Sequence, residues 1–125
     1  MARILVIDDD PDLRAVLEQM LRPAGYEVVL AADGREGVAQ FRAQSADVVI
    51  TDLYMPHQEG FETINELRRR FPGIAIIAMS GKPAAATLLS IAQKLGVTAA
   101  LQKPFTSDEL LAAVEKALSK EPRVA

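Results

Sequence analysis

The chain has 125 residues, half of them hydrophobic and a quarter charged, as is typical of a single soluble globular domain. It has no cysteine, which excludes a disulfide framework and a thiolate metal site, and its net charge of −3 argues against nucleic acid as a direct partner. No apolar run reaches the roughly 20 residues that span a bilayer, and the first residues carry no signal-peptide pattern, so we expect a cytoplasmic protein with no membrane partner.

Strand-like and helix-like segments alternate five times along the chain. Short apolar runs without alternation predict buried strands, whereas apolar residues at helical spacing predict amphipathic helices. Asp10-Pro11 is typical of a helix start, and Ser107 with its acidic neighbours predicts the N-cap of the last helix. In chain order we expect strand 3–7, a helix from 11 to about 23, strand 26–31, a turn at Asp33-Gly34 and a helix around Val38 and Phe41 that ends at about 43. Strand 47–51 follows, then a helix from 59 or 60 to 71, strand 74–79, a helix from about 84 to 95, strand 99–102 and a helix from 106 or 107 onward.

Five strand–helix units with short connections imply a doubly wound α/β fold, a parallel sheet covered by helices on both faces. The sequence has no internal linker, repeat or low-complexity stretch. We therefore assign residues 1–119 to one domain and 120–125 to a C-terminal tail or the start of a linker. The expected apolar face of the first helix is Leu13, Val16, Leu17, Met20 and Leu21, and that of the last helix is Leu110, Leu111, Val114 and Leu118.

Four of the five expected strands end in side chains that suit phosphoryl chemistry. The first strand runs into Asp8, Asp9 and Asp10, the third into Asp52, the fourth into Ser80 and the fifth into Lys103. The carboxyl ends of strands in a parallel sheet converge on one crevice, where such folds bind ligands. The sequence therefore predicts one site that combines carboxylates, a hydroxyl and an amine.

These residue types suggest a division of roles within that site. Asp8, Asp9 and Asp52 suit a hard divalent ion such as Mg²⁺, which takes oxygen ligands, whereas Asp10 is expected to cap the following helix. Asp52 could instead attack phosphorus and become an acyl phosphate. Lys103 offers a positive charge for a phosphate oxygen or for the free carboxylate.

The chain resembles the receiver domain of two-component response regulators from residue 3 to about residue 119. The resemblance rests on Ile-Leu-Val-Ile-Asp-Asp-Asp at 4–10, Asp-Leu-Tyr-Met-Pro at 52–56 with Glu-Gly at 59–60, Met-Ser-Gly at 79–81 and Lys-Pro-Phe at 103–105. Each motif alone is weak, but together and in this order they are specific. The resemblance implies a flavodoxin-like (βα)5 fold with strand order 2-1-3-4-5.

The resemblance also implies a role for each site residue. Asp52 is the phosphoacceptor, Asp8, Asp9, Asp52 and the main-chain carbonyl of Tyr54 hold Mg²⁺, Ser80 is the switch hydroxyl and Lys103 pairs with the phosphoryl group. The Lys103–Pro104 bond is often cis in such domains. The implied partners are a histidine kinase or histidine phosphotransfer protein and a downstream protein or effector domain, and a phosphorylation-dependent homodimer is compatible with the resemblance.

Two positions depart from the pattern of receivers. Ala100 stands three residues before Lys103, where receivers usually carry an aromatic side chain whose rotation accompanies the switch, so signalling through such a ring is in doubt. Lys82 is a cation beside the site, which could contact a phosphoryl group but is more simply a solvated lysine. His57, the only histidine, is expected to be exposed and not a ligand.

Two other classes of function remain open from the sequence. A pseudo-receiver or scaffold would act by protein contact without phosphorylation, which Ala100 favours slightly and the intact acidic residues oppose. A small phosphatase would use Asp52 as its nucleophile, but such chemistry usually needs a carboxylate two residues on, where Tyr54 stands. We therefore expect a phosphorylation switch rather than a metabolic enzyme.

Overall fold

The computed structural model describes residues 1–53, 60–81 and 85–119. Tyr54, His57, Lys82 and the tail 120–125 lie outside the described residues, so the expectations for them stay predictions. The strands are β1 (Arg3–Ile7), β2 (Glu27–Ala31), β3 (Val48–Asp52), β4 (Ala75–Ser80) and β5 (Ala99–Gln102). The helices are α1 (Pro11–Leu21), α2 (Gly34–Ala43), α3 (Gly60–Arg70), α4 (Ala85–Lys94) and α5 (Ser107–Ser119), with a 3-10 turn at Arg22–Ala24.

The five strands form one parallel sheet in the order β2-β1-β3-β4-β5. This arrangement confirms the predicted doubly wound fold, and the boundaries of the described elements differ from the expected ones by about a residue. The three inner strands are buried almost throughout. Burial on both faces explains why these strands read as continuous apolar runs.

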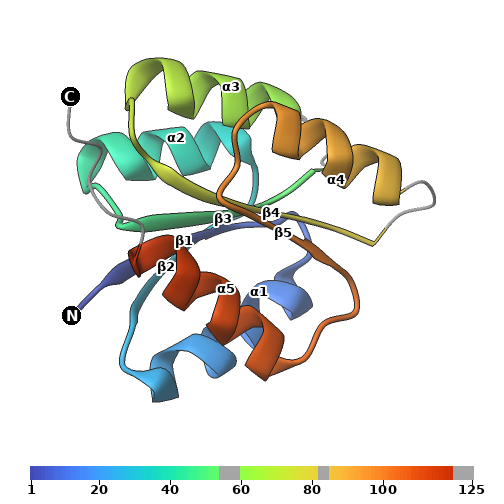
Figure 1. Ribbon diagram of the computed structural model, residues 1–125. Coiled ribbons are helices and arrows are strands. Elements are labelled where there is room, and N and C mark those ends of the chain that lie inside the picture. The colour runs from blue at the N-terminus through green and yellow to red at the C-terminus, as the bar shows by residue number, and fades with distance from the viewer. Residues whose placement is uncertain (54–59, 82–84, 120–125) are drawn as a thin grey trace.

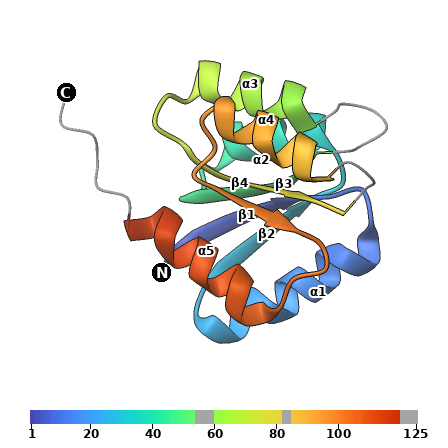
Figure 2. The same cartoon turned by 45° about the vertical axis from the view of Figure 1, so that its right-hand side comes forward.

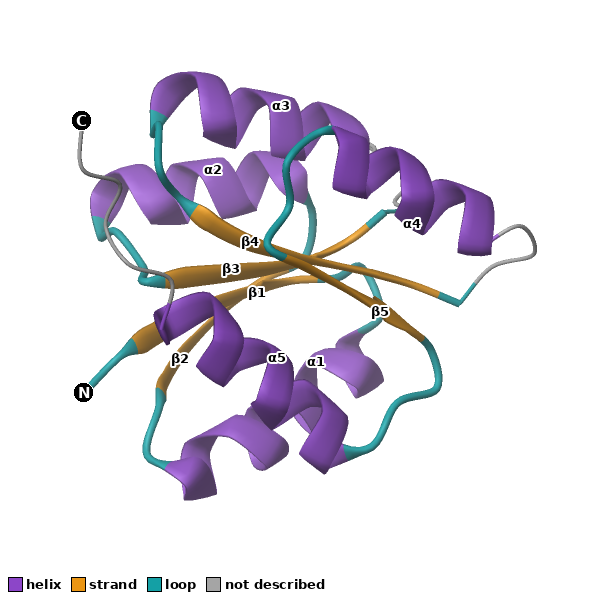
Figure 3. Cartoon of the chain, in the orientation of Figure 1, coloured by secondary structure: helices purple, strands orange, loops and turns teal. Residues whose placement is uncertain are grey.

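Helices cover both faces of the sheet (Figures 1 and 3), with α2, α3 and α4 on one side and α1 and α5 on the other. The turned view again places α1 and α5 next to each other beneath the sheet (Figure 2). Alternate residues of each strand feed the two hydrophobic clusters, so that Ile4 and Val6 pack toward α1 and α5 while Leu5 and Ile7 pack toward α2 and α3.

Short polar residues begin three of the helices. Asp10 caps α1 by accepting hydrogen bonds from the main-chain N–H groups of Asp12 and Leu13, as predicted. Asp33, which the sequence placed in a turn, caps α2 by accepting from the N–H of Glu36. These caps set the direction in which each helix leaves the end of its strand.

The prediction of Ser107 as the cap of the last helix is wrong. Thr106 holds this position: its hydroxyl accepts from the N–H of Glu109 at 3.1 Å, and the Glu109 carboxylate accepts from the N–H of Thr106 at 2.9 Å. This reciprocal pair is a capping box, which needs a hydroxyl residue three positions before a glutamate. Thr106 satisfies that spacing and Ser107 does not.

The expected apolar face of α5 is also corrected at one position. The buried residues are Leu110, Ala113, Val114 and Ala117, whereas Leu118 is 37% exposed. The buried set follows the helical spacing of three, four and seven residues, and Leu118 falls one step beyond that stripe. The small side chains of Ala113 and Ala117 let the helix lie close to the sheet at these two positions.

Candidate functional site

The pairing of the strands places Asp8 and Asp52 next to each other at one edge of the sheet. Ile7 is paired with Thr51 across β1 and β3. Asp8 and Asp52 are the residues that follow this pair, so the parallel register brings them to the same level. The Asp8 carboxylate is fully buried, and the side chain of Asp52 is only 7% exposed. The predicted meeting of these two strand ends is present.

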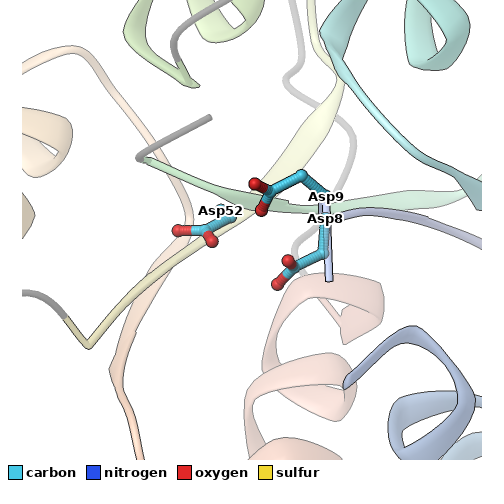
Figure 4. Close-up of side chains that lie close together, drawn as sticks. All are labelled: Asp8, Asp9 and Asp52. Atoms are coloured by element: carbon cyan, nitrogen blue, oxygen red, sulfur yellow. The ribbon is translucent and has the colours of Figure 1, made fainter. Parts of the chain in front are cut away.

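The exposed side chain of Asp9 joins them to form a triad of carboxylates (Figure 4). One oxygen from each of Asp8, Asp9 and Asp52 can be chosen so that the three atoms lie within 4.8 Å of one another. Hard divalent cations bind carboxylate oxygens with only small adjustments of such an arrangement. Among the residues that the structure describes, this is the cluster of acidic groups suited to a metal ion.

Lys103 brings a positive charge to the same place from the end of β5. Its Nζ donates hydrogen bonds to Oδ2 of Asp8 and to Oδ2 of Asp52, each at 3.1 Å. The main chain of Lys103 is fixed by its N–H, which donates to the carbonyl of Ser80 at 2.9 Å. The Lys103–Pro104 bond is cis, in agreement with the expectation. Lys103 therefore links the two buried carboxylates.

Burial and charge act against each other in these groups. Burial raises the pKa of Asp8, and the neighbouring charge of Asp52 raises it further, although the N–H of Asp10 and the ammonium of Lys103 oppose the shift. Burial alone would lower the pKa of Lys103, but the carboxylates of Asp52 and Asp8 outweigh it and raise that pKa. The site thus holds an ammonium firmly charged beside a carboxylate whose charge is costly.

Ser80 supplies a buried hydroxyl one residue beyond the pair formed by Asp52 and Met79. No group among the described residues lies within hydrogen-bond distance of its Oγ. Buried hydroxyls almost always have a partner, and each exception needs an explanation. A ligand with acceptor oxygens at this edge of the sheet would provide one.

Arg14 is a residue of the site that the sequence reasoning missed. Its Nη1 donates to the main-chain carbonyl of Asp8 at 2.7 Å, from the first turns of α1. A cation near the start of a helix is unfavourable to the helix dipole unless something else compensates it. A positively charged residue near the start of a helix, shortly after three aspartates, is the sequence signal that could have identified Arg14 as part of the site.

Gly60 fixes the end of β3 against the start of α3. Its N–H donates to the carbonyl of Leu53 at 3.2 Å, and a Cβ at this position would overlap the carbonyl oxygen of Asp52. Because main-chain atoms have little freedom to give way, only glycine fits this contact. Gly60 belongs to the Glu-Gly pair at 59–60, whose sequence alone does not indicate this packing role.

A cavity of about 550 Å³ opens between α1 and the connection from β5 to α5. Asp52 and Lys103 border it, and Val16 and Phe105 contribute apolar surface from opposite sides. This position explains why Val16, expected on the buried face of α1, is 45% exposed. Phe105 packs on the hydrophobic core next to α5.

Ala100 lies opposite Ala78 across β5 and β4 and packs against the cluster under α4. Lys103 follows three positions later, just past the end of β5, so the strand places Ala100 behind the site, toward α4. The position where receivers usually carry an aromatic side chain, here Ala100, therefore lies between the site and α4.

Comparisons with known proteins agree on one family. The response regulator receiver domain matches residues 4–115 of the chain. The transcriptional regulatory protein ZraR of Escherichia coli K12 is 37% identical over 116 residues, which are 93% of this chain and 26% of ZraR. NtrC of Rhizobium meliloti is 32% identical over 122 residues, 98% of this chain and 25% of that protein. The chain thus spans about a quarter of the length of these relatives.

Solved structures give the same result. A response regulator receiver domain from Clostridium thermocellum superposes with a TM-score of 0.89 at 33% identity, covering 96% of each chain. The response regulator TrrA of Thermotoga maritima, solved in complex with Mg²⁺ and beryllium fluoride, gives a TM-score of 0.85 at 34% identity and covers 94% of this chain and all of its own. No helix among the described residues is long and apolar enough to cross a membrane. With its fold, its strand-end residues and these relatives taken together, the chain belongs to the receiver domain family of two-component response regulators.

Proposed function

We propose that this domain is a phosphorylation switch that takes a phosphoryl group onto Asp52. The observation that carries the proposal is the placement of Lys103, whose ammonium contacts the carboxylates of both Asp8 and Asp52 at 3.1 Å. A cation at that point can neutralise negative charge on a group that is transferred to Asp52. Membership of the receiver family supports the same role.

In the proposed transfer, one carboxylate oxygen of Asp52 forms a bond to phosphorus while the bond between phosphorus and the donor nitrogen breaks. The donor is a phosphohistidine of a histidine kinase or phosphotransfer protein, and its imidazole keeps the electron pair and takes up a proton from solvent. Lys103 pairs with a phosphoryl oxygen, and the hydroxyl of Ser80 donates a hydrogen bond to another. Water later attacks phosphorus, the bond between phosphorus and the Asp52 oxygen breaks, and inorganic phosphate leaves while the Asp52 carboxylate is regenerated.

The acidic triad fits Mg²⁺ by its donor set. Asp8, Asp9 and Asp52 offer hard oxygen ligands close together, Asp9 is exposed, and the Ser80 hydroxyl lacks a partner among the described residues. The main-chain carbonyl of Tyr54 is proposed as a further ligand. When bound, the ion would supply positive charge against the phosphoryl oxygens. The chain's own part is to hold the three carboxylates together and to place the ammonium of Lys103 beside Asp52.

The domain is proposed to act on a partner rather than on a metabolite. The relatives ZraR and NtrC are named as transcriptional regulators and are about four times as long. We propose that phosphorylation changes the contact of residues 1–119 with an effector domain or separate protein, or between two copies of the chain. The tail 120–125 is proposed as the start of a connection or a free end.

Incubation with Mg²⁺ and acetyl phosphate tests the proposal, with intact mass and peptide mapping as the readout. We expect one phosphoryl group on Asp52 in the wild type and none in Asp52→Asn. The matched control is Asp12→Asn, which removes an exposed carboxylate of α1 and should be phosphorylated as the wild type is. An unmodified wild-type protein, or the same modification in Asp52→Asn, would contradict the proposal and favour a scaffold that acts without phosphorylation.

A further inference from the structure

Gly81 and Lys103 lie side by side where the chain leaves the sheet. Ser80 is paired with Gln102 across β4 and β5, so the residues that follow them are neighbours. The N–H of Lys103 donates to the Ser80 carbonyl at 2.9 Å and holds the two chains together at this point. Both Gly81 and Lys103 border the cavity that contains Asp52.

The stem of Lys103 occupies the space in which a side chain at position 81 would lie. A Cβ built on Gly81 would be 2.8 Å from Cβ of Lys103, 3.2 Å from its Cδ and 3.5 Å from its Cγ. Carbon atoms in favourable contact are separated by about 3.5–4.0 Å. The stem therefore runs along the main chain of Gly81 with no room for one more carbon.

The contact with Cβ of Lys103 is the one that rotation cannot relieve. Cγ and Cδ can move by changing side-chain torsions, but Cβ is bonded to a main chain that the hydrogen bond to Ser80 fixes. An added Cβ at position 81 would therefore have to shift the main chain of Lys103, and the rest of the lysine stem would have to rotate away from it. The ammonium at the far end has two hydrogen bonds of 3.1 Å, which are already at the long end of the usual range.

We propose that Gly81 is a positioning residue for Lys103. Because position 81 has no side chain, the aliphatic stem of Lys103 can lie directly against the main chain of Gly81. In this position the stem places the ammonium between the carboxylates of Asp8 and Asp52. The part played by Lys103 in phosphoryl transfer rests on the proposed function. The placement itself is a property of the unmodified chain and can be measured without any phosphoryl donor.

The test is a series in which position 81 grows, Gly81→Ala and then Gly81→Val, studied by NMR of the lysine side-chain ammonium groups. Lys103→Met identifies the Lys103 signal in the wild type by its loss. We expect that signal to be distinct from those of exposed lysines such as Lys94 and Lys116. In Gly81→Ala it should move toward their positions, and in Gly81→Val it should reach them or broaden away.

A control variant separates placement from a general effect of an added methyl group. The three atoms nearest to a Cβ at position 37 all belong to the side chain of Ile7, within the core under α2, so Gly37→Ala should leave the Lys103 signal unchanged. Circular dichroism and urea unfolding show which variants keep the fold. If Gly81→Val does not fold, Gly81→Ala alone decides the outcome.

Phosphorylation by acetyl phosphate with Mg²⁺ gives the second readout. We expect the initial rate to fall by about ten- to a hundredfold across the series, in parallel with the movement of the ammonium signal. A fall in rate with the Lys103 signal in place would show that position 81 controls access to Asp52, and would overturn the proposal. An unchanged signal and rate would overturn it as well. If the wild type is never phosphorylated, the proposed function fails, while the NMR series still decides whether Gly81 places Lys103.

Discussion

Replacing Lys103 by methionine removes the ammonium that contacts the buried carboxylates of both Asp8 and Asp52. Among the described residues, no other cationic side chain contacts both. Methionine keeps most of the length and apolar contact of the stem, so the change isolates the ammonium. In the wild type that ammonium lies 3.1 Å from an oxygen of Asp8 and 3.1 Å from an oxygen of Asp52. The side chains of Lys103, Asp8 and Asp52 are 22%, 0% and 7% exposed.

The expected loss of stability follows from these contacts. Removing one partner of a buried ion pair costs about 3–5 kcal/mol, because the remaining charge is left without compensation. Lys103 keeps some contact with water, so we expect the lower end, about 3 kcal/mol in metal-free solution. An unfolding entropy of about 2.1 cal/mol/K per residue, over the 125 residues of the chain, converts this loss into a fall of about 11 °C in Tm.

Mg²⁺ should return most of that stability if it binds the carboxylates as proposed. A divalent cation at the acidic triad supplies the charge that the variant lacks, so the loss in saturating Mg²⁺ should shrink to about 1 kcal/mol. The difference of about 2 kcal/mol must then appear as tighter binding, by about 30-fold, since every 1.4 kcal/mol is a factor of ten. On the proposed function, Lys103 and the metal would both neutralise the carboxylates of Asp8 and Asp52.

Urea unfolding with and without Mg²⁺, together with a Mg²⁺ titration followed by NMR, measures both quantities. Lys116→Met is the matched control, because it removes an exposed lysine from the last turn of α5 and should change stability by no more than about 0.5 kcal/mol. An equal loss of stability with and without Mg²⁺, or unchanged Mg²⁺ affinity, would refute the reasoning. Either result would mean that Lys103 and the metal do not neutralise the same carboxylates.

Three further changes test the local structure. Gly60→Ala should destabilise the domain by about 3 kcal/mol in urea unfolding, because its Cβ meets the main chain of Asp52. A loss no larger than that of Gly37→Ala, whose Cβ has atoms of the Ile7 side chain as its nearest neighbours, would contradict this. Asp10→Ala should cost about 1 kcal/mol through loss of the cap of α1, and an unchanged midpoint would show that other groups satisfy those N–H donors. The raised pKa of Lys103 means that its stabilisation is complete below about pH 10.4, the unfolded value, and is lost as the pH rises through the higher folded value. The stability difference between the wild type and Lys103→Met should therefore stay constant up to about pH 10 and shrink above it, and a difference that shrinks near neutral pH would contradict the assignment.

The fold could be predicted because its strands are buried on both faces. Unbroken runs such as 4–7 and 74–79 could only be inner strands, and each was followed by a helix pattern. Parallel register then required the strand ends to meet, which is why Asp8, Asp52 and Lys103 could be assigned to one site before their distances were known. Periodicity and chain order carry this information.

Contacts made by main-chain atoms could not be predicted in the same way. The hydrogen bond from Arg14 to the Asp8 carbonyl and the fit of Gly60 against Asp52 depend on the path of the backbone, which side-chain patterns do not encode. The cap at Thr106 is different, because the spacing to Glu109 was visible and the adjacent serine obscured it. Leu118 was wrongly assigned to the buried face of the last helix, because its apolar side chain does not distinguish a buried position from the exposed position next to it.

The balance of charge at the site gives a reason why an amine alone does not suffice. Among the described residues, three carboxylates meet one ammonium, which contacts two of them, and the guanidinium of Arg14 binds the main-chain carbonyl of Asp8, so negative charge is in excess around a carboxylate that is fully buried and whose pKa is raised by burial. A divalent cation matches that excess, whereas an incoming phosphoryl group would add to it. Asp52 should therefore stay unmodified by acetyl phosphate when Mg²⁺ is removed by a chelator, although Lys103 already contacts it. Phosphorylation at the same rate in chelator and in Mg²⁺ would show that Lys103 compensates the charge by itself.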